Sequence, residues 1–190
     1  MDPFLFALRV MGNSRKPGTG KVEMGREIDV LLVEERSVDA EVTLSALRRG
    51  ATREATVLRL RDGNEALRYL FSVGEFANRS TGMPGLVLLD MGMPVTSGLC
   101  VLDVMRAHPA TKDIPVVMLT TDNRPRFAED YGFSPDGYLV KSQDFDQYCA
   151  AIELALKRWL PRILKEHHSR AWTALQRLTL RCLGSLTGFR

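Results

Sequence analysis

Five side chains that could carry chemistry stand at the ends of short apolar segments of the chain. Glu34 and Glu35 follow VLLV, Asp90 closes LVLLD, Thr120 lies in IPVVMLTT, and Lys141 follows YLV. Segments this short and this apolar are typical of strands that are buried on both faces of a parallel sheet. Because the carboxyl ends of parallel strands meet at one edge of their sheet, we expect these five groups to lie close together.

Three carboxylates at one edge repel one another unless a cation lies among them. A small, hard divalent ion with oxygen ligands, Mg²⁺ or Mn²⁺, suits such a site. A carboxylate beside such an ion can attack a phosphoryl group and form an acyl phosphate. Thr120 and Lys141 could then donate hydrogen bonds to the phosphoryl oxygens. The five residues therefore predict a phosphoryl-transfer site that depends on a divalent metal.

The pattern of apolar and polar residues predicts five strands that alternate with five helices. Ser37 and Asp62 are expected to cap the first two helices, and Gly50 and Pro109 to end the first and third. The expected strands span 30–33, 55–60, 86–90, 114–121 and 137–140, and the expected helices span 37–49, 62–71, 99–108, 124–131 and 144–160. This alternation predicts a doubly wound α/β fold with a five-stranded parallel sheet.

With these segments in place, the chain resembles the receiver domains of two-component response regulators. The resemblance is carried by LLVEE for the acidic pair, LLDMGMP with Gly98 for the phosphoacceptor, IPVVMLTT for the hydroxyl, and YLVK for an aromatic residue and the lysine. It covers residues 28–160 and implies a flavodoxin-like fold. The segments GEFAN, HPATKDIPVVMLTT and RWL are most similar to the single-domain regulators that partner bacterial and cyanobacterial phytochromes.

The resemblance implies a role for each candidate residue. Asp90 would be the phosphoacceptor, Thr120 would hydrogen-bond one phosphoryl oxygen, and Lys141 would pair with another. Tyr138 matches the aromatic switch residue, whose ring would fill the space that Thr120 leaves when it moves toward the phosphoryl group. No organic cofactor is expected.

The resemblance also implies a metal shell for Mg²⁺ or Mn²⁺. Glu35 would ligate the ion directly, Glu34 would act through water, and Asp90 and the backbone carbonyl of Gly92 would complete the protein ligands. The chain departs from the family pattern at Glu35, because the second acid is usually Asp, which is shorter by one methylene. We expect the longer side chain to shift the ion or to weaken its binding.

These residues leave two functions open and disfavour a third. The first is a stand-alone response regulator that accepts a phosphoryl group on Asp90 from a sensor histidine kinase, with a phytochrome as one candidate, and signals through protein contacts. Such a protein is not an enzyme, since only its own Mg²⁺-dependent phosphorylation and dephosphorylation occur on it. The second is a pseudo-receiver that is never phosphorylated and acts as a docking or adaptor module. A hydrolase of the haloacid-dehalogenase kind is disfavoured, because its nucleophilic Asp follows the first strand, where this chain has Glu34 and Glu35.

Charge is distributed unevenly along the 190 residues. Residues 28–160 hold 15 basic and 19 acidic residues, whereas 1–27 hold 5 and 3, and 161–190 hold 6 and 1. We therefore expect a flexible N-terminal extension at 1–27, a receiver domain at 28–160 and a basic amphipathic extension at 161–190. The net charge of +3 then says little about partners, and no DNA-binding domain is expected, because 30 residues cannot form an independent core.

The apolar run at 4–8 is too short for a signal peptide, and no later run reaches the length of a membrane span, so we expect a cytoplasmic protein. Met11 and Met24 are alternative starts to Met1. The three cysteines show no metal-binding spacing and are expected to be free thiols.

The resemblance further implies a homodimer. Its interface would involve the fourth and fifth helices and the fifth strand, with Trp159, Leu160 and the tail as candidate contributors. The tail itself stays open between a helix docked on the domain or on a second subunit, a disordered segment and, least favoured, a segment that contacts a membrane or nucleic acid.

Overall fold

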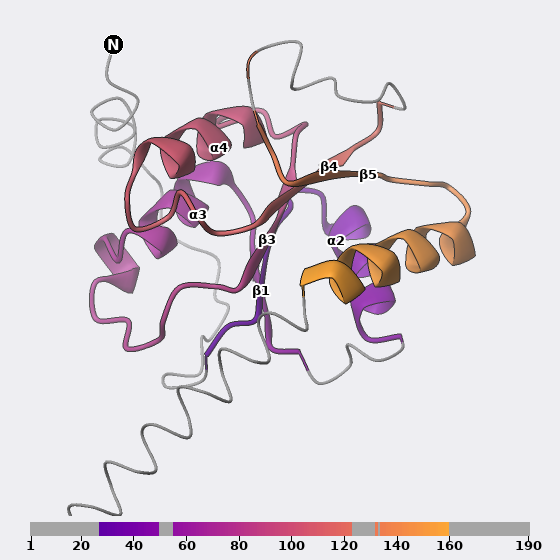
Figure 1. The fold of residues 1–190 in the computed structure, drawn as a ribbon, viewed down its shortest axis with the longest axis horizontal. Coiled ribbons are helices and arrows are strands. Elements are labelled where there is room, and N and C mark those ends of the chain that lie inside the picture. The colour runs from indigo at the N-terminus through magenta and orange to yellow at the C-terminus, as the bar shows by residue number, and fades with distance from the viewer. Residues whose placement is uncertain (1–26, 50–54, 123–131, 133, 160–190) are drawn as a thin grey trace, which may run out of the picture.

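The computed structural model describes residues 27–49, 55–122, 132 and 134–159 (Figure 1). Five parallel strands form one sheet in the order β2-β1-β3-β4-β5. The strands are β1 (Val30–Val33), β2 (Val57–Leu60), β3 (Leu86–Asp90), β4 (Val116–Thr120) and β5 (Gly137–Val140). This order confirms the doubly wound, flavodoxin-like fold, with β1 and β3 side by side at the point where the strand order reverses.

Helices cover both faces of the sheet. They are α2 (Ser37–Leu47), α3 (Gly63–Leu70), the short 3₁₀ helix η1 (Gly74–Phe76), α4 (Gly98–Ala107) and a last helix at 145–159. In Figure 1, α3 and α4 lie on one side of the sheet, and α2 and the last helix lie on the other. The chain therefore forms three layers with the sheet in the middle.

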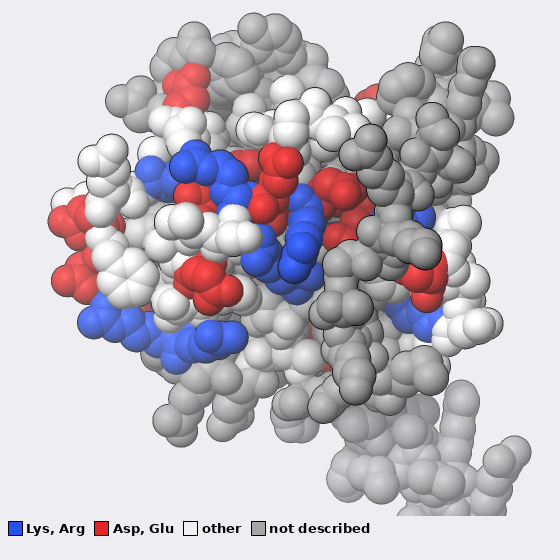
Figure 2. Space-filling view, turned by 180° about the vertical axis from the view of Figure 1, so that it is seen from behind, with Lys and Arg blue, Asp and Glu red and all other residues white. Residues whose placement is uncertain are grey.

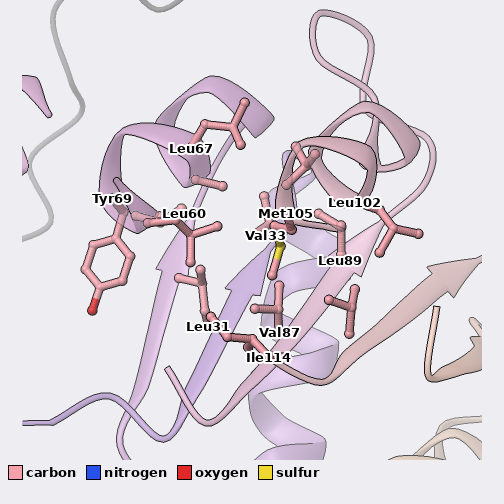
Figure 3. Close-up of a cluster of buried hydrophobic side chains, with 14 of the residues drawn as sticks. Leu31, Val33, Leu60, Leu67, Tyr69, Val87, Leu89, Leu102, Met105 and Ile114 are labelled. Atoms are coloured by element: carbon pink, nitrogen blue, oxygen red, sulfur yellow. The ribbon is translucent and has the colours of Figure 1, made fainter. Parts of the chain in front are cut away.

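Two apolar clusters hold these layers together, because alternate residues of each strand point to opposite faces. Leu31 and Val33 pack toward α3 and α4, in the cluster shown in Figure 3. Val30 and Leu32 pack toward α2 and the last helix. All four side chains are fully buried. Burial on both faces explains why β1 is a continuous apolar run instead of an alternating pattern.

The ends of several elements differ from the prediction by one or two residues. Ser37 does not cap α2 as predicted; it is the first helical residue, and Arg36 holds the N-cap position without a side-chain hydrogen bond. The prediction was wrong because residue type alone does not distinguish the N-cap position from the first helical position next to it. At α3 the predicted cap is confirmed, since the Asp62 side chain accepts a hydrogen bond from the Glu65 N–H. The helix predicted from residue 144 starts one residue later, because the Asp144 carboxylate accepts hydrogen bonds from two N–H groups of its first turn.

Some predictions lie outside the described residues. These are the helix at 124–131, the end of the first helix at Gly50, Leu160 and the tail at 161–190, and residues 1–26 of the N-terminal extension. Within the residues that are described, no helix is both long enough and apolar enough to cross a bilayer. On the face seen in Figure 2, the described Lys and Arg side chains lie among Asp and Glu side chains. That part of the surface is therefore not the single-sign basic patch that nucleic acid backbones favour.

Candidate functional site

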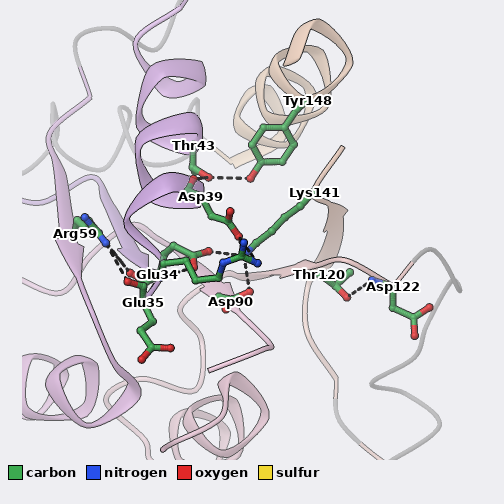
Figure 4. Close-up of polar contacts among 11 residues, drawn as sticks. Glu34, Glu35, Asp39, Thr43, Arg59, Asp90, Thr120, Asp122, Lys141 and Tyr148 are labelled. Carbon is green, nitrogen blue, oxygen red and sulfur yellow. Dashed lines mark hydrogen bonds and ion pairs between the residues drawn. The ribbon is translucent and has the colours of Figure 1, made fainter. Parts of the chain in front are cut away.

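Four residues that the sequence analysis selected stand at the carboxyl ends of four neighbouring strands (Figure 4). Glu34 follows β1, Asp90 ends β3, Thr120 ends β4 and Lys141 follows β5. Since β1 pairs with β3, β3 with β4 and β4 with β5, all in parallel, these ends lie along one edge of the sheet. The parallel pairing thus brings together residues that are up to 107 positions apart in the sequence.

The Lys141 ammonium is the centre of this site. Its Nζ lies 2.5 Å from Oε2 of Glu34, 2.7 Å from Oδ1 of Asp90 and 3.1 Å from Oδ2 of Asp39. The side chains of Lys141, Glu34 and Asp90 are 11%, 0% and 8% exposed. An ammonium has three N–H donors, so three carboxylates match its full hydrogen-bonding capacity. One positive charge is therefore shared among three negative charges in a place that water barely reaches.

Asp39 is the member of this cluster that sequence reasoning missed. It lies in the first turn of α2, where an acidic residue is ordinarily explained by the helix dipole. The signal that could have found it is its spacing, five residues after Glu34. Five residues are enough for the chain to leave β1, turn and complete the first turn of α2, so the side chain of Asp39 can lie near the end of the strand. Figure 4 shows Asp39 pointing down from α2 toward Lys141.

Burial and charge both act on the ionisation of the cluster. Burial on its own lowers the pKa of Lys141, but the hydrogen bonds and charges of Asp90 and Glu34 outweigh it and raise that pKa well above its ordinary value. The pKa of Glu34 is raised by burial, and the charge of Asp90 adds to this shift, while Lys141 opposes it. Lys141 is thus held in its charged form, and burial makes the charged form of Glu34 costly.

A pocket of about 400 Å³ opens beside this cluster. Two cations, two carboxylates and two hydroxyls line it, together with a glycine and two apolar residues: Arg36, Lys141, Asp39, Asp90, Thr120, Thr121, Gly92, Met91 and Leu99. Its volume is enough to hold a small anion such as a phosphoryl group together with hydration. The pocket therefore combines a buried carboxylate that can accept a group with donors that can bind its oxygens.

Glu35 does not join the residues that line this pocket. Its side chain is exposed, and Figure 4 shows it pointing away from Asp90 and Lys141. Its carbonyl and that of Glu34 accept hydrogen bonds from the Arg59 guanidinium, which holds the turn after β1 in place. Of the predicted metal ligands, Asp90 and Gly92 line the pocket and Glu34 lies buried under it. Among the described residues, no three His, Cys, Asp or Glu side chains are arranged to hold a metal ion.

Thr120 and Tyr138 occupy neighbouring strands on one face of the sheet. Thr120 lines the pocket, and its Oγ1 accepts a hydrogen bond from the Asp122 N–H over 2.9 Å. Tyr138 pairs in register with Met118, two residues before Thr120, so Tyr138, Met118 and Thr120 share a face. Tyr138 packs against the same apolar cluster as Met118. The Tyr138 ring therefore lies on the strand next to that of Thr120, the residue whose movement the ring is predicted to follow.

The loop after Asp90 is held by two glycines. At Gly98, the first residue of α4, a Cβ would overlap with the backbone carbonyl oxygen of Asp90. At Gly63 a Cβ would lie 2.5 Å from the carbonyl oxygen of Thr96. Both positions allow a close backbone approach that a side chain would prevent. The two helices α3 and α4 thereby fix the loop that carries Gly92 into the pocket.

Comparison with known proteins agrees with this geometry. The family of response regulator receiver domains matches residues 30–153. The response regulator Rcp1 of Synechocystis is 31% identical over 135 residues, which covers 70% of this chain and 90% of Rcp1. Among solved structures, the phosphorylated cyanobacterial phytochrome response regulator RcpA is 32% identical with a TM-score of 0.62, covering 71% of this chain and 95% of RcpA. The bacteriophytochrome response regulator AtBRR is 37% identical with a TM-score of 0.59, covering 67% of this chain and 92% of AtBRR.

Proposed function

The chain belongs to the family of response regulator receiver domains, most similar to regulators linked to phytochromes, and from this premise we propose that it accepts a phosphoryl group on Asp90. The donor is a phosphohistidine of a sensor histidine kinase, and the output is a change in protein contacts. Receiver domains are signalling phosphoacceptors and not enzymes that turn over a substrate. The observation that carries the proposal is the 2.7 Å contact between Lys141 Nζ and Asp90 Oδ1 at the edge of an open pocket.

The proposed step is an in-line displacement at phosphorus. A carboxylate oxygen of Asp90 forms the new P–O bond, and the P–N bond to the donor imidazole breaks, with its electron pair going to nitrogen. Lys141 then donates to a phosphoryl oxygen while Glu34 and Asp39 keep its position. Thr120 is buried, with 7% of its surface exposed, and its hydroxyl donates to a second oxygen. Positioning and charge stabilisation supply the catalysis in such a transfer.

A divalent cation, Mg²⁺ or Mn²⁺, belongs to this proposal. Asp90 and the Gly92 carbonyl would ligate it, Glu34 would act through water, and Glu35 would ligate it directly once its exposed side chain turns toward the pocket. The donor set fits, because all of these groups are the hard oxygen ligands that such ions prefer. A structure of Rcp1 with Mn²⁺ bound is among the solved structures similar to this chain, at 29% identity and a TM-score of 0.61. When bound, the ion would neutralise charge between the carboxylate and the phosphoryl group.

The test is phosphorylation with a small donor, acetyl phosphate, in the presence of Mg²⁺. We expect intact-protein mass spectrometry to show one added phosphoryl group on the wild type and none on Asp90→Asn. Asp136→Asn is the matched control. Asp136 comes just before β5, at the opposite end of the strand from Lys141, and pairs with Arg106. Equal labelling of the wild type and Asp90→Asn would overturn the proposal.

The alternative is a pseudo-receiver that acts as a docking or adaptor module without phosphorylation. The orientation of Glu35, away from the pocket, is the observation that favours it. A protein of this kind would bind its partner equally well as wild type and as Asp90→Asn. A second experiment separates the two functions. Candidate histidine kinases, phytochromes included, are labelled with phosphate and mixed with the wild type and with Asp90→Asn. Transfer of label to the wild type alone supports the regulator.

We further propose that two copies associate through the last helix and β5. Val140 on β5 is 42% exposed and Leu154 on the last helix is 72% exposed, so each of these two elements has an exposed apolar side chain that such a contact could bury. Trp159 packs against the cluster on the α2 face, so within one chain it already has a core role. Light scattering tests the association: Leu154→Arg should lower the measured mass, and Val38→Arg, at an equally exposed position on α2, should not. Removal of the residues after Leu160 tests the contribution of the tail.

The proposed domain limits are 28–160 for the receiver, with extensions at 1–27 and 161–190. The family match at 30–153 supports the central unit. Limited proteolysis that leaves a fragment of these limits intact would support them.

A further inference from the structure

One carboxylate oxygen lies between two cations at the mouth of the pocket. Oδ2 of Asp39 is 3.1 Å from Lys141 Nζ and 3.7 Å from Nη1 of Arg36. All three residues line the pocket together with Asp90. Lys141 is 11% exposed in its side chain, whereas Arg36 is 69% exposed. Lys141 is thus a fixed cation inside the site, and Arg36 is a cation free to move at its entrance.

Arg36 is held at the pocket by its backbone and not by its side chain. Its N–H donates to Oε1 of Glu34 over 3.0 Å, and its carbonyl accepts from the Ala40 N–H over 2.9 Å at the start of α2. The 3.7 Å distance to Asp39 exceeds the range of a direct hydrogen bond. Exposed pairs of this kind contribute little to stability. The guanidinium can therefore leave Asp39 at little cost in stability, while the Cα of Arg36 stays in place.

A phosphoryl group on Asp90 would bring more negative charge than Lys141, the buried cation of the described cluster, can balance. It brings about 1.5 to 2 negative charges and three acceptor oxygens. Two of the three Lys141 N–H donors already serve Glu34 and Asp39, which leaves one for the phosphoryl group. The hydroxyls of Thr120 and Thr121, which also line the pocket, can supply two more. Among the described residues that line the pocket, Arg36 is the remaining cation, and a guanidinium suits the outer oxygens because it can donate two parallel hydrogen bonds.

We propose that Arg36 is a further phosphoryl-binding residue of this receiver. Its guanidinium leaves Asp39 when Asp90 carries a phosphoryl group and closes the open side of the pocket over that anion. Arg36 would then set how tightly this receiver holds a tetrahedral anion. The inference rests on the proposed function, because it needs Asp90 to be the acceptor.

Beryllofluoride, which adds to an aspartate carboxylate as a phosphoryl mimic, is the probe. Its affinity for the full chain is measured by titration calorimetry in saturating Mg²⁺ at low and at moderate salt. Arg36→Gln should weaken beryllofluoride binding about threefold to tenfold and reduce its dependence on salt, because an ionic contact is lost. Arg36→Lys should restore part of the affinity. Arg158→Gln, which removes a cation from the last helix, should bind as the wild type does.

Two results would overturn the inference in distinguishable ways. If the wild type binds the probe and Arg36→Gln binds it equally well at both salt concentrations, Arg36 does not contact the anion. If the wild type and Asp90→Asn behave alike, the proposed function fails and the role of Arg36 fails with it. Thermal unfolding of Arg36→Gln checks that the fold is intact, as expected for a side chain that is 69% exposed.

Discussion

The ammonium of Lys141 lies 2.7 Å from Oδ1 of Asp90, and Asp90 is one of three carboxylates around it. Within the described cluster the acids outnumber the one buried cation, so the free energy of the site depends on its charge state. A group that brings positive charge reduces the repulsion among the three carboxylates. Loss of the ammonium leaves their negative charges without a buried cation.

Replacing Lys141 with Met should lower the free energy of unfolding by about 3 kcal/mol, because Glu34 is fully buried and would lose its cation. Urea denaturation at neutral pH measures the change. The double variant Lys141→Met/Asp90→Asn should recover part of the loss, since one of the repelling charges is gone. A Lys141→Met protein as stable as the wild type would contradict the view that this ammonium balances the cluster.

Gly98→Ala should lower the free energy of unfolding by about 1–3 kcal/mol, because the new Cβ would overlap with the Asp90 carbonyl oxygen. Gly92→Ala serves as the control. A Cβ there would lie 3.6 Å from Oδ2 of Asp90, which is ordinary contact. Urea midpoints for the two variants should therefore differ clearly. Equal midpoints would show that the backbone approach at Gly98 is not needed.

Glu35→Asp should tighten Mn²⁺ binding severalfold. The shorter acid has one fewer rotatable bond to order when it turns toward the pocket, and it restores the acid that is usual in the family. Electron paramagnetic resonance of free Mn²⁺ gives the dissociation constant directly. Glu41→Asp is a matched change at an exposed position on the outside of α2 and should leave the constant unchanged. Unchanged binding by Glu35→Asp would remove Glu35 from the ligand set, and weaker binding would contradict the expected advantage of the shorter acid.

The buried hydrogen bond between Tyr148 and Thr43, 2.9 Å long, should make stability sensitive to alkali. Burial raises the pKa of Tyr148 above its ordinary 10.0. A raised pKa means that the contribution to stability is full below pH 10.0 and is lost as the pH rises through the folded-state value. Tyr148→Phe should cost about 1 kcal/mol at neutral pH, and its deficit against the wild type should shrink above pH 10.0.

Urea midpoints of the two proteins from pH 7 to pH 11 measure this deficit. Other lysines and tyrosines titrate in both proteins, so the difference between them isolates Tyr148. A deficit that stays constant with pH would mean that the folded and unfolded pKa values of Tyr148 are equal.

Local residue patterns were enough to predict the sheet and most of the chemistry at the strand ends. Apolar runs such as VLLV require burial on both faces, and alternation with helices requires parallel strands. Parallel strands place their carboxyl ends together, so the meeting of Glu34, Asp90 and Lys141 followed from local pattern alone. The same logic located Thr120, because its strand ends at that edge.

Helix phase, side-chain direction and close backbone approach, in contrast, depend on the folded chain and could not be predicted from local patterns. Asp39 reaches Lys141 from the first turn of α2. That helix packs on the sheet through buried residues such as Ala40 and Leu47, in a cluster whose strand residues are mostly far from α2 in sequence order. Glu35 turns away while Arg36 lines the pocket, since neighbouring residues in a turn point in different directions that no periodicity predicts. The start of α2 at Ser37, with Arg36 as its N-cap, was likewise decided by the backbone and not by residue type. The sequence pattern predicts which residues could form the site. Which of them line the same pocket depends on the folded chain.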